Sequence, residues 1–207
     1  MADELPLLAL AALGALLGLD VVSFPQAMIS RPIVAATLAG ALVGDLAAGL
    51  LIGAVLELVA IETLPFGASR YPEWGSAAVV GGALAAQHGL AQPGGLALAA
   101  LVALATAWAG GESMILLRRL NGQLARAKLD RLAAGSARSV IGLQLAGLAS
   151  DAVRGFALTV VALLVAEPLA RRGVAAWTLD AMWSRAIVVT LAAMVAGGAV
   201  WKLVHAV

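Results

Sequence analysis

The sequence has no cysteine and two histidines, His88 and His205. Disulfides, thiolate metal sites, cysteine nucleophiles and a histidine-based zinc cluster are therefore excluded, and no metal or other cofactor is expected. Charged residues make up 12% of the chain, against roughly 25% in ordinary globular proteins. Thirteen Lys and Arg against twelve Asp and Glu leave a net charge of +1, which supplies no basic field for nucleic acid. A nucleic-acid partner is not expected.

Hydrophobic residues make up 62% of the sequence, which exceeds the roughly 45 to 50% of soluble proteins. This composition is typical of an integral membrane protein. A bilayer core takes about 20 helical residues, so 207 residues hold at most about seven spans. We expect an all-α, polytopic fold in which residues 1–207 form a single membrane domain. Acidic residues precede the apolar run 5–19, so we interpret that run as a retained first segment and not as a signal peptide.

The segment from about 118 to 138 is the one separator that resembles an aqueous loop. It carries six Lys and Arg against Asp130 alone. Basic flanks of apolar runs resist translocation, which places this loop in the cytoplasm. The alternative, a basic helix lying on anionic lipid, has the same sidedness. If the apolar run 139–167 crosses the membrane once from this loop, Arg171 and Arg172 lie outside, against the positive-inside rule. That run is therefore either broken or poorly oriented by charge.

Two further features outside this segment are informative, an interrupted apolar region and a pair of opposite charges. The apolar region 76–117 is interrupted by Gln87-His88-Gly89 and by Gln92-Pro93-Gly94-Gly95, which predicts a short piece, a turn, and a full span over 95–117. Asp151 and Arg154 are three residues apart and share a helical face, which predicts a structural ion pair, with a substrate contact as the alternative.

Residues 30–67 have the clearest boundaries in the chain. Ser30 can cap a helix that starts near Pro32, and Pro65 with Gly67 ends the apolar run. The intervening 33–64 is too long for one span, at about 48 Å, and too short for two. We therefore predict a re-entrant helical hairpin at about 31–64, turned near Gly44-Asp45 to Gly49. Such broken helices are tolerated where they are buried or line a wet cavity.

Two acids lie within this apolar stretch. Asp45 and Glu57 would each cost about 2.5 to 3.5 kcal/mol at the centre of a membrane helix, so each needs a partner or a wet cavity. A carboxylate suits a sugar hydroxyl, a proton or a cation, and Asp45 can also cap a half-helix at the turn. The glycine pairs Gly40/Gly44 and Gly49/Gly53 predict edges for close helix packing.

The same stretch resembles a known signature. The run Gly40-x3-Gly44-Asp45-x3-Gly49-Leu50-Leu51-x-Gly53, ending in Leu56-Glu57, is similar to that of the membrane component IIC of the mannose, fructose and sorbose class of bacterial phosphotransferase systems. Ala54 and Val55 depart from the pattern. The similarity extends over most of the chain, through Gln26, Arg31-Pro32, Gly67-Ala68, Pro72-Glu73 and Arg154-Gly155-Phe156-Ala157-Leu158-Thr159.

This resemblance implies a multi-pass subunit of the bacterial inner membrane that translocates a hexose. It implies a IID membrane partner, assembly as a trimer of IIC–IID pairs, and cytoplasmic IIA and IIB components that relay phosphate from phosphoenolpyruvate through histidines. The IIC chain then carries no phosphoryl-transfer residue of its own. The resemblance places the sugar contacts at Glu57 and Gln26, and Asp45 and Arg31 are further candidates.

Two other functions remain open from the residues. Asp45 and Glu57 could form the proton or cation site of an ion-coupled transporter or channel. The chain ends at Val207, short of the usual family length, which would suit a sensor or assembly subunit that does not transport. Tyr71 and Trp74 could stack on a sugar ring or anchor the chain at the membrane interface.

Overall fold

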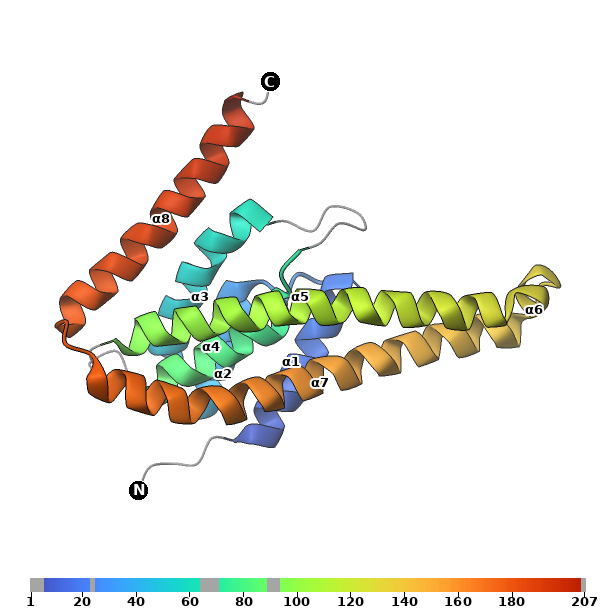
Figure 1. Cartoon of the computed structure of the whole chain (residues 1–207), viewed down its shortest axis with the longest axis horizontal. Coiled ribbons are helices and arrows are strands. Elements are labelled where there is room, and N and C mark those ends of the chain that lie inside the picture. The colour runs from blue at the N-terminus through green and yellow to red at the C-terminus, as the bar shows by residue number, and fades with distance from the viewer. Residues whose placement is uncertain (1–5, 23–24, 64–70, 89–93, 206–207) are drawn as a thin grey trace.

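A computed structural model describes residues 6–22, 25–63, 71–88 and 94–205, and this part of the chain is helical (Figure 1). Four segments are long and apolar enough to cross a membrane: Leu46–Thr63, Gly95–Ala127, Ala137–Gly173 and Ala181–Lys202. The prediction of an all-α, multi-pass membrane fold is confirmed. The helices are α1 (Leu7–Val22), α2 (Pro32–Val43), α3 (Leu46–Ala60), the 3-10 helix η1 (Ile61–Thr63), α4 (Trp74–His88), α5 (Gly95–Ala127), α6 (Leu129–Ala133), α7 (Ala137–Ala176) and α8 (Ala181–His205).

The predicted hairpin is formed by α2 and α3, which pack against each other. Their 12 and 15 residues correspond to about 18 and 22 Å, close to the two short arms expected. Gly44 turns the chain with a φ of 102°, a left-handed conformation that glycine adopts without steric cost. Asp45 then caps α3 by accepting a hydrogen bond from the Ala48 amide at 2.9 Å. The predicted stop at Pro65 and Gly67 lies outside the described residues.

The glycines of the hairpin face each other across it. A methyl group added at Gly49 would lie 2.5 Å from the Ala36 carbonyl oxygen and 2.9 Å from the Gly40 Cα. One added at Gly53 would lie 2.9 Å from the Ile33 Cα. The predicted close packing is therefore between the two arms themselves. Gly44 departs from the prediction because it has open space around it and serves the turn.

Helix α4 is the centre of the bundle. Its residues from Trp74 to Ala85 are all buried, and it contacts α1, α2, α3, α5 and α7. Small side chains allow this crowding, because a methyl group at Gly82 would lie only 2.4 Å from the Ala36 carbonyl oxygen of α2. The α2–α3 hairpin is thus packed on a buried helix, as broken helices in a membrane require.

The basic segment 118–138 is mostly helical, which differs from the predicted loop. The break before Gly95 is confirmed, but α5 continues past Leu117 to Ala127, and α6 and the start of α7 occupy most of the remainder. Figure 1 shows α5 and α7 running side by side beyond the other helices to α6. The reversal is at Gly135, whose φ is 73°. Good helix formers such as Leu, Arg and Ala continue the helix after the apolar run ends.

Helix α7 is unbroken over 40 residues, about 60 Å, although Pro168 lies inside it. Arg171 and Arg172 are therefore at the opposite end of α7 from the segment 118–138, and basic residues flank this helix at both ends. Charge alone does not orient it, and the cytoplasmic position of 118–138 stays a prediction. The predicted ion pair between Asp151 and Arg154 is confirmed, with 2.9 Å between carboxylate and guanidinium.

Candidate functional site

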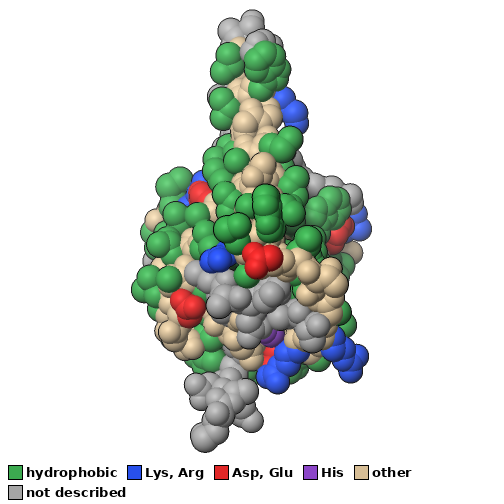
Figure 2. Space-filling model, turned by 90° about the vertical axis from the view of Figure 1, so that its left-hand side faces the viewer, with side chains coloured by type: hydrophobic (Ala, Val, Ile, Leu, Met, Phe, Trp, Pro, Cys, Tyr) green, Lys and Arg blue, Asp and Glu red, His purple; other side chains and the backbone are tan. Residues whose placement is uncertain are grey.

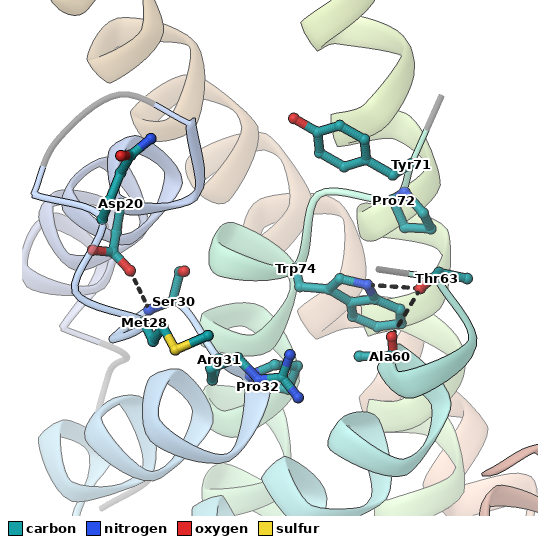
Figure 3. A pocket seen from close by; sticks show the side chains of 11 residues that line it. Asp20, Met28, Ser30, Arg31, Pro32, Ala60, Thr63, Tyr71, Pro72 and Trp74 are labelled. Atoms are coloured by element: carbon teal, nitrogen blue, oxygen red, sulfur yellow. Dashed lines mark hydrogen bonds between the residues drawn. The ribbon is translucent and has the colours of Figure 1, made fainter. Parts of the chain in front are cut away.

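A cavity of about 200 Å³ lies where α2 begins and α3 ends (Figure 3). One wall is the connection between α1 and α2, and the opposite wall is the segment that leads into α4. Arg31 and Pro32 lie between the two walls in Figure 3. The polar lining comes from Asp20, Gln26, Ser30, Arg31, Thr63 and Tyr71, and the apolar lining from Met28, Pro32, Ala60, Pro72 and Trp74.

Asp20 organises the first wall. Its side chain is 2% exposed and accepts hydrogen bonds from the backbone amides of Ala27 at 2.7 Å and Ser30 at 2.9 Å. These bonds hold a loop in which Gln26 and Met28 have φ values of 58° and 61°. A left-handed conformation at a non-glycine residue costs about 1 to 3 kcal/mol, so the loop is held in a shape that it would not adopt alone.

Sequence reasoning missed Asp20. The available signal was its position as a single acid directly after the apolar run 5–19, where an unpaired charge is unfavourable. Its role follows from the hydrogen bonds that it accepts from two backbone amides, and no pattern in the sequence indicates those partners. The result is that the predicted residue Gln26 lies on the cavity wall.

Arg31 and Glu57 form an ion pair that joins the start of α2 to the end of α3. The second oxygen of Glu57 accepts the Ile33 amide at 3.2 Å, so this carboxylate also caps α2. The prediction that Ser30 caps this helix is wrong, because Pro32 is the first helical residue and the N-cap position is therefore Arg31. The side chains of Arg31 and Glu57 are 32% and 19% exposed, so water reaches the pair.

The structure brings three of the four predicted site residues together. Gln26 and Arg31 line the cavity, and Glu57 pairs with Arg31 beside it. Asp45 is separate from them, because it lies at the hairpin turn while Glu57 is near the other end of α3. Twelve residues of helix between Asp45 and Glu57 correspond to about 18 Å.

Tyr71 and Trp74 provide the opposite wall. The indole N–H of Trp74 donates to the Thr63 hydroxyl at 3.0 Å, and that side chain is buried on the cavity and not exposed as an interfacial anchor would be. The Tyr71 hydroxyl accepts from the Arg118 guanidinium at 2.7 Å, and the same guanidinium lies 5.2 Å from the ring centroid. Thr63, Tyr71 and Pro72 also line a second cavity of about 260 Å³ beside Trp108 and Glu112.

A buried polar cluster lies behind this wall. Glu73, 1% exposed, accepts the Ser76 amide at 3.1 Å and so caps α4. A methyl group at Gly18 would lie 3.9 Å from the Glu73 carboxylate and 3.7 Å from the Arg154 guanidinium, so these two side chains are neighbours. Arg154 is itself held by Asp151. The motif fragments around Glu73 and Arg154, far apart in sequence, therefore meet in the fold.

The cavity has the groups that bind a neutral, hydroxyl-rich ligand. The Gln26 amide can donate and accept, the Arg31 guanidinium donates, and the Glu57 carboxylate accepts. Aromatic side chains add flat faces for the C–H side of a sugar ring. Within the described ranges, no three His, Asp or Glu side chains lie close enough to share a metal ion.

The family described as the sorbose-specific IIC component of the PTS system matches residues 5–200. A solved structure described as a membrane protein has a TM-score of 0.76 at 21% identity, and the match covers 98% of this chain and 81% of that one. The mannose transporter ManYZ, solved in complex with a microcin, gives 0.66 at 21% identity, with coverage of 99% and 82%. None of the curated proteins compared with the chain matches it. The two structures share the fold.

Proposed function

Because the chain belongs to the family of sorbose-specific IIC components of the phosphotransferase system, and is thus a sugar-translocating membrane subunit, we propose that the cavity between α1, α2, α3 and α4 binds its sugar. The observation that carries this proposal is that Gln26 and Arg31 line one cavity and that Arg31 is paired there with Glu57. The proposed ligand is a hexose, whose hydroxyls suit both the amide and the ion pair.

The Arg31–Glu57 ion pair can bind the sugar and stay intact. Each partner has hydrogen-bonding capacity beyond the contact between them, since a guanidinium has five donors and a carboxylate about four acceptor sites. The pair fixes the direction of both groups, and its partial exposure lets water leave when a hydroxyl enters. A buried polar group that loses its water without a replacement is penalised, so a ligand lacking those hydroxyls is rejected.

The proposed assembly follows from the same family. The chain, as one membrane domain over 1–207, pairs with a IID subunit in the bacterial inner membrane, and three such pairs form a trimer. It presents the hexose to the cytoplasmic IIB component, which is phosphorylated through IIA. No phosphoryl transfer occurs on this chain. His88 is 7% exposed and lies at the end of α4, which is a poor position for exchange with a soluble protein.

The test is sugar phosphorylation dependent on phosphoenolpyruvate, in vesicles that contain this chain with its IIA, IIB and IID partners. Glu57→Gln and Gln26→Ala should each raise the KM for the sugar about 10- to 100-fold, the equivalent of one hydrogen bond to a charged or buried group. Asp130→Asn, on the exposed helix α6, is the matched control and should leave KM unchanged. If both site variants behave as Asp130→Asn does, the cavity is not the sugar site.

Two other functions are separated by the same vesicles. An ion-coupled transporter needs Asp45 and Glu57 in one site, and their separation of about 18 Å along α3 does not favour this. Its uptake would collapse with a protonophore and ignore phosphoenolpyruvate. A sensor or assembly subunit would bind the sugar and give no flux.

A further inference from the structure

An apolar groove of about 440 Å³ separates α8 from α3 and α5. It is lined on α8 by residues from Ser184 to Val195, on α3 by residues from Val55 to Val59, and on α5 by residues from Ala97 to Leu104. Trp177 and Leu179, in the connection before α8, also line it, and the Trp177 indole donates to the Ser184 hydroxyl. Figure 1 shows α8 running alongside α3 on its outer side, and α8 also contacts α5 and η1. Figure 2 shows the C-terminal part of α8 projecting as a column that carries hydrophobic side chains. The groove is outside the sugar cavity and shares none of its lining residues.

The side chains of α8 show how it sits in a bilayer. Trp183 and Trp201 are 62% and 65% exposed, and their separation of 18 residues corresponds to about 27 Å. This is close to the hydrocarbon thickness of about 30 Å. Arg185 lies two residues after Trp183, and Lys202 directly follows Trp201. Aromatic and basic residues at both ends of an apolar helix mark the two interfaces, so Trp183 and Arg185 lie at one membrane surface.

The length of the groove matches one leaflet. From Ser184 to Val195 is 11 residues, or about 16 Å along α8. Half of a hydrocarbon core of about 30 Å is about 15 Å. The groove therefore starts at one interface and ends near the middle of the bilayer, which is the depth of one acyl chain.

A cation that the protein does not neutralise lies next to the interfacial end of the groove, because Arg185 directly follows the lining residue Ser184. Arg185 is half-buried and its Nε donates to the Ala181 carbonyl at 3.1 Å, but no acidic side chain in the described part of the chain pairs with it. Lys202, at the other interface, pairs with Glu62. An arginine at the membrane surface attracts a phosphate, which its planar guanidinium can bind through two hydrogen bonds.

We propose that this groove is a structural phospholipid site, with one acyl chain lying between α8 and the α3–α5 surface and the phosphate on Arg185. The acyl chain fills the space between α8 and the α3–α5 surface and so holds α8 against α3. Because α3 also carries Glu57, the lipid supports the helix that positions the ion pair, but the lipid site does not depend on the sugar assignment.

The test measures phospholipid phosphorus per chain after purification in detergent, and the unfolding temperature after adding phosphatidylglycerol or phosphatidylethanolamine with the same tails. The wild-type chain should retain one phospholipid and be stabilised by added lipid. Val195→Trp fills the groove and should abolish both effects. Leu164→Trp, the matched control on an exposed face of α7, should behave as the wild type does. Arg185→Gln should weaken lipid binding about fivefold, and Arg185→Lys less.

Two results would overturn the proposal. One is equal lipid retention in the wild type and Val195→Trp; should that variant fail to fold, Leu101→Trp, at a groove residue that is 59% exposed, repeats the test. The other is release of the lipid when the partner membrane subunit is added, because the groove would then hold a protein helix. A preference for phosphatidylglycerol supports recognition of net charge, and equal binding of the two lipids supports recognition of the phosphate.

Discussion

Charged side chains inside this protein are held by specific partners, some nearby in the sequence and some far from it. Glu57 of α3 caps α2 and pairs with Arg31, and Asp20 of α1 binds the amides of the following loop. Arg154 is 9% exposed and lies between Asp151 and Glu73. Each of these acids thereby has a cation or a backbone amide beside it, in surroundings that make an isolated charge very unfavourable.

At the scale of single residues, we expect Arg154→Gln to be severely destabilising. The substitution removes the Arg154 cation from beside the buried Asp151 and Glu73, and breaking such a pair costs about 3 to 5 kcal/mol. The unfolding midpoint in detergent should fall accordingly. Adding Asp151→Asn to Arg154→Gln should restore part of the loss, because it removes one of the two buried carboxylates that Arg154 neutralises. An unchanged unfolding midpoint in Arg154→Gln would show that the Asp151–Arg154 pair does not contribute to stability.

At the scale of elements, the α2–α3 hairpin is defined by backbone contact. Its arms approach closely enough that Gly40 and Gly49 have no room for a side chain. The approach determines the positions of the hairpin ends, and Arg31 and Glu57 lie at one of those ends. Close packing at the glycines and the geometry of the cavity are therefore linked through two stiff helices.

Gly49→Ala tests this link. The added methyl group meets the Ala36 carbonyl oxygen at 2.5 Å, so α2 and α3 must separate, at a cost of about 1 to 3 kcal/mol. Both the unfolding midpoint and the sugar affinity should fall. Gly142→Ala is the matched control, because it lies in α7 with no other group within 4 Å and should stabilise the helix by up to about 1 kcal/mol. Equal behaviour of the two variants would contradict the role assigned to the Gly40–Gly49 contact.

At the scale of the whole molecule, α7 determines which segments lie on opposite sides of the membrane. It runs unbroken for about 60 Å, from the reversal at Gly135 to the corner before α8. This length exceeds the hydrocarbon thickness of about 30 Å. If α7 crosses the membrane, its two ends therefore lie on opposite surfaces. The bases at both ends leave the direction of crossing to be measured.

Single cysteines measure that direction directly, since the sequence contains none. We expect Ala134→Cys, within the predicted cytoplasmic segment, to be labelled in intact cells by a membrane-permeant maleimide and not by an impermeant one. Thr178→Cys, in the connection between α7 and α8, should react with both reagents. Labelling of both positions from the same side would show that α7 does not cross the membrane, and reversed labelling would place the basic segment outside.

The sequence by itself determined the class of the protein and the local form of its hairpin. High apolar content, the position of Pro32 and the turn at Gly44 act over short distances, so composition and spacing report them. Only the tertiary structure decided which side chains meet: Asp20 beside Gln26, Trp74 across from Arg31, and Glu57 as the cap of the facing helix. In a membrane helix most faces are apolar, so the pattern of residues does not indicate which face meets which neighbour, and backbone partners for a carboxylate are set by packing.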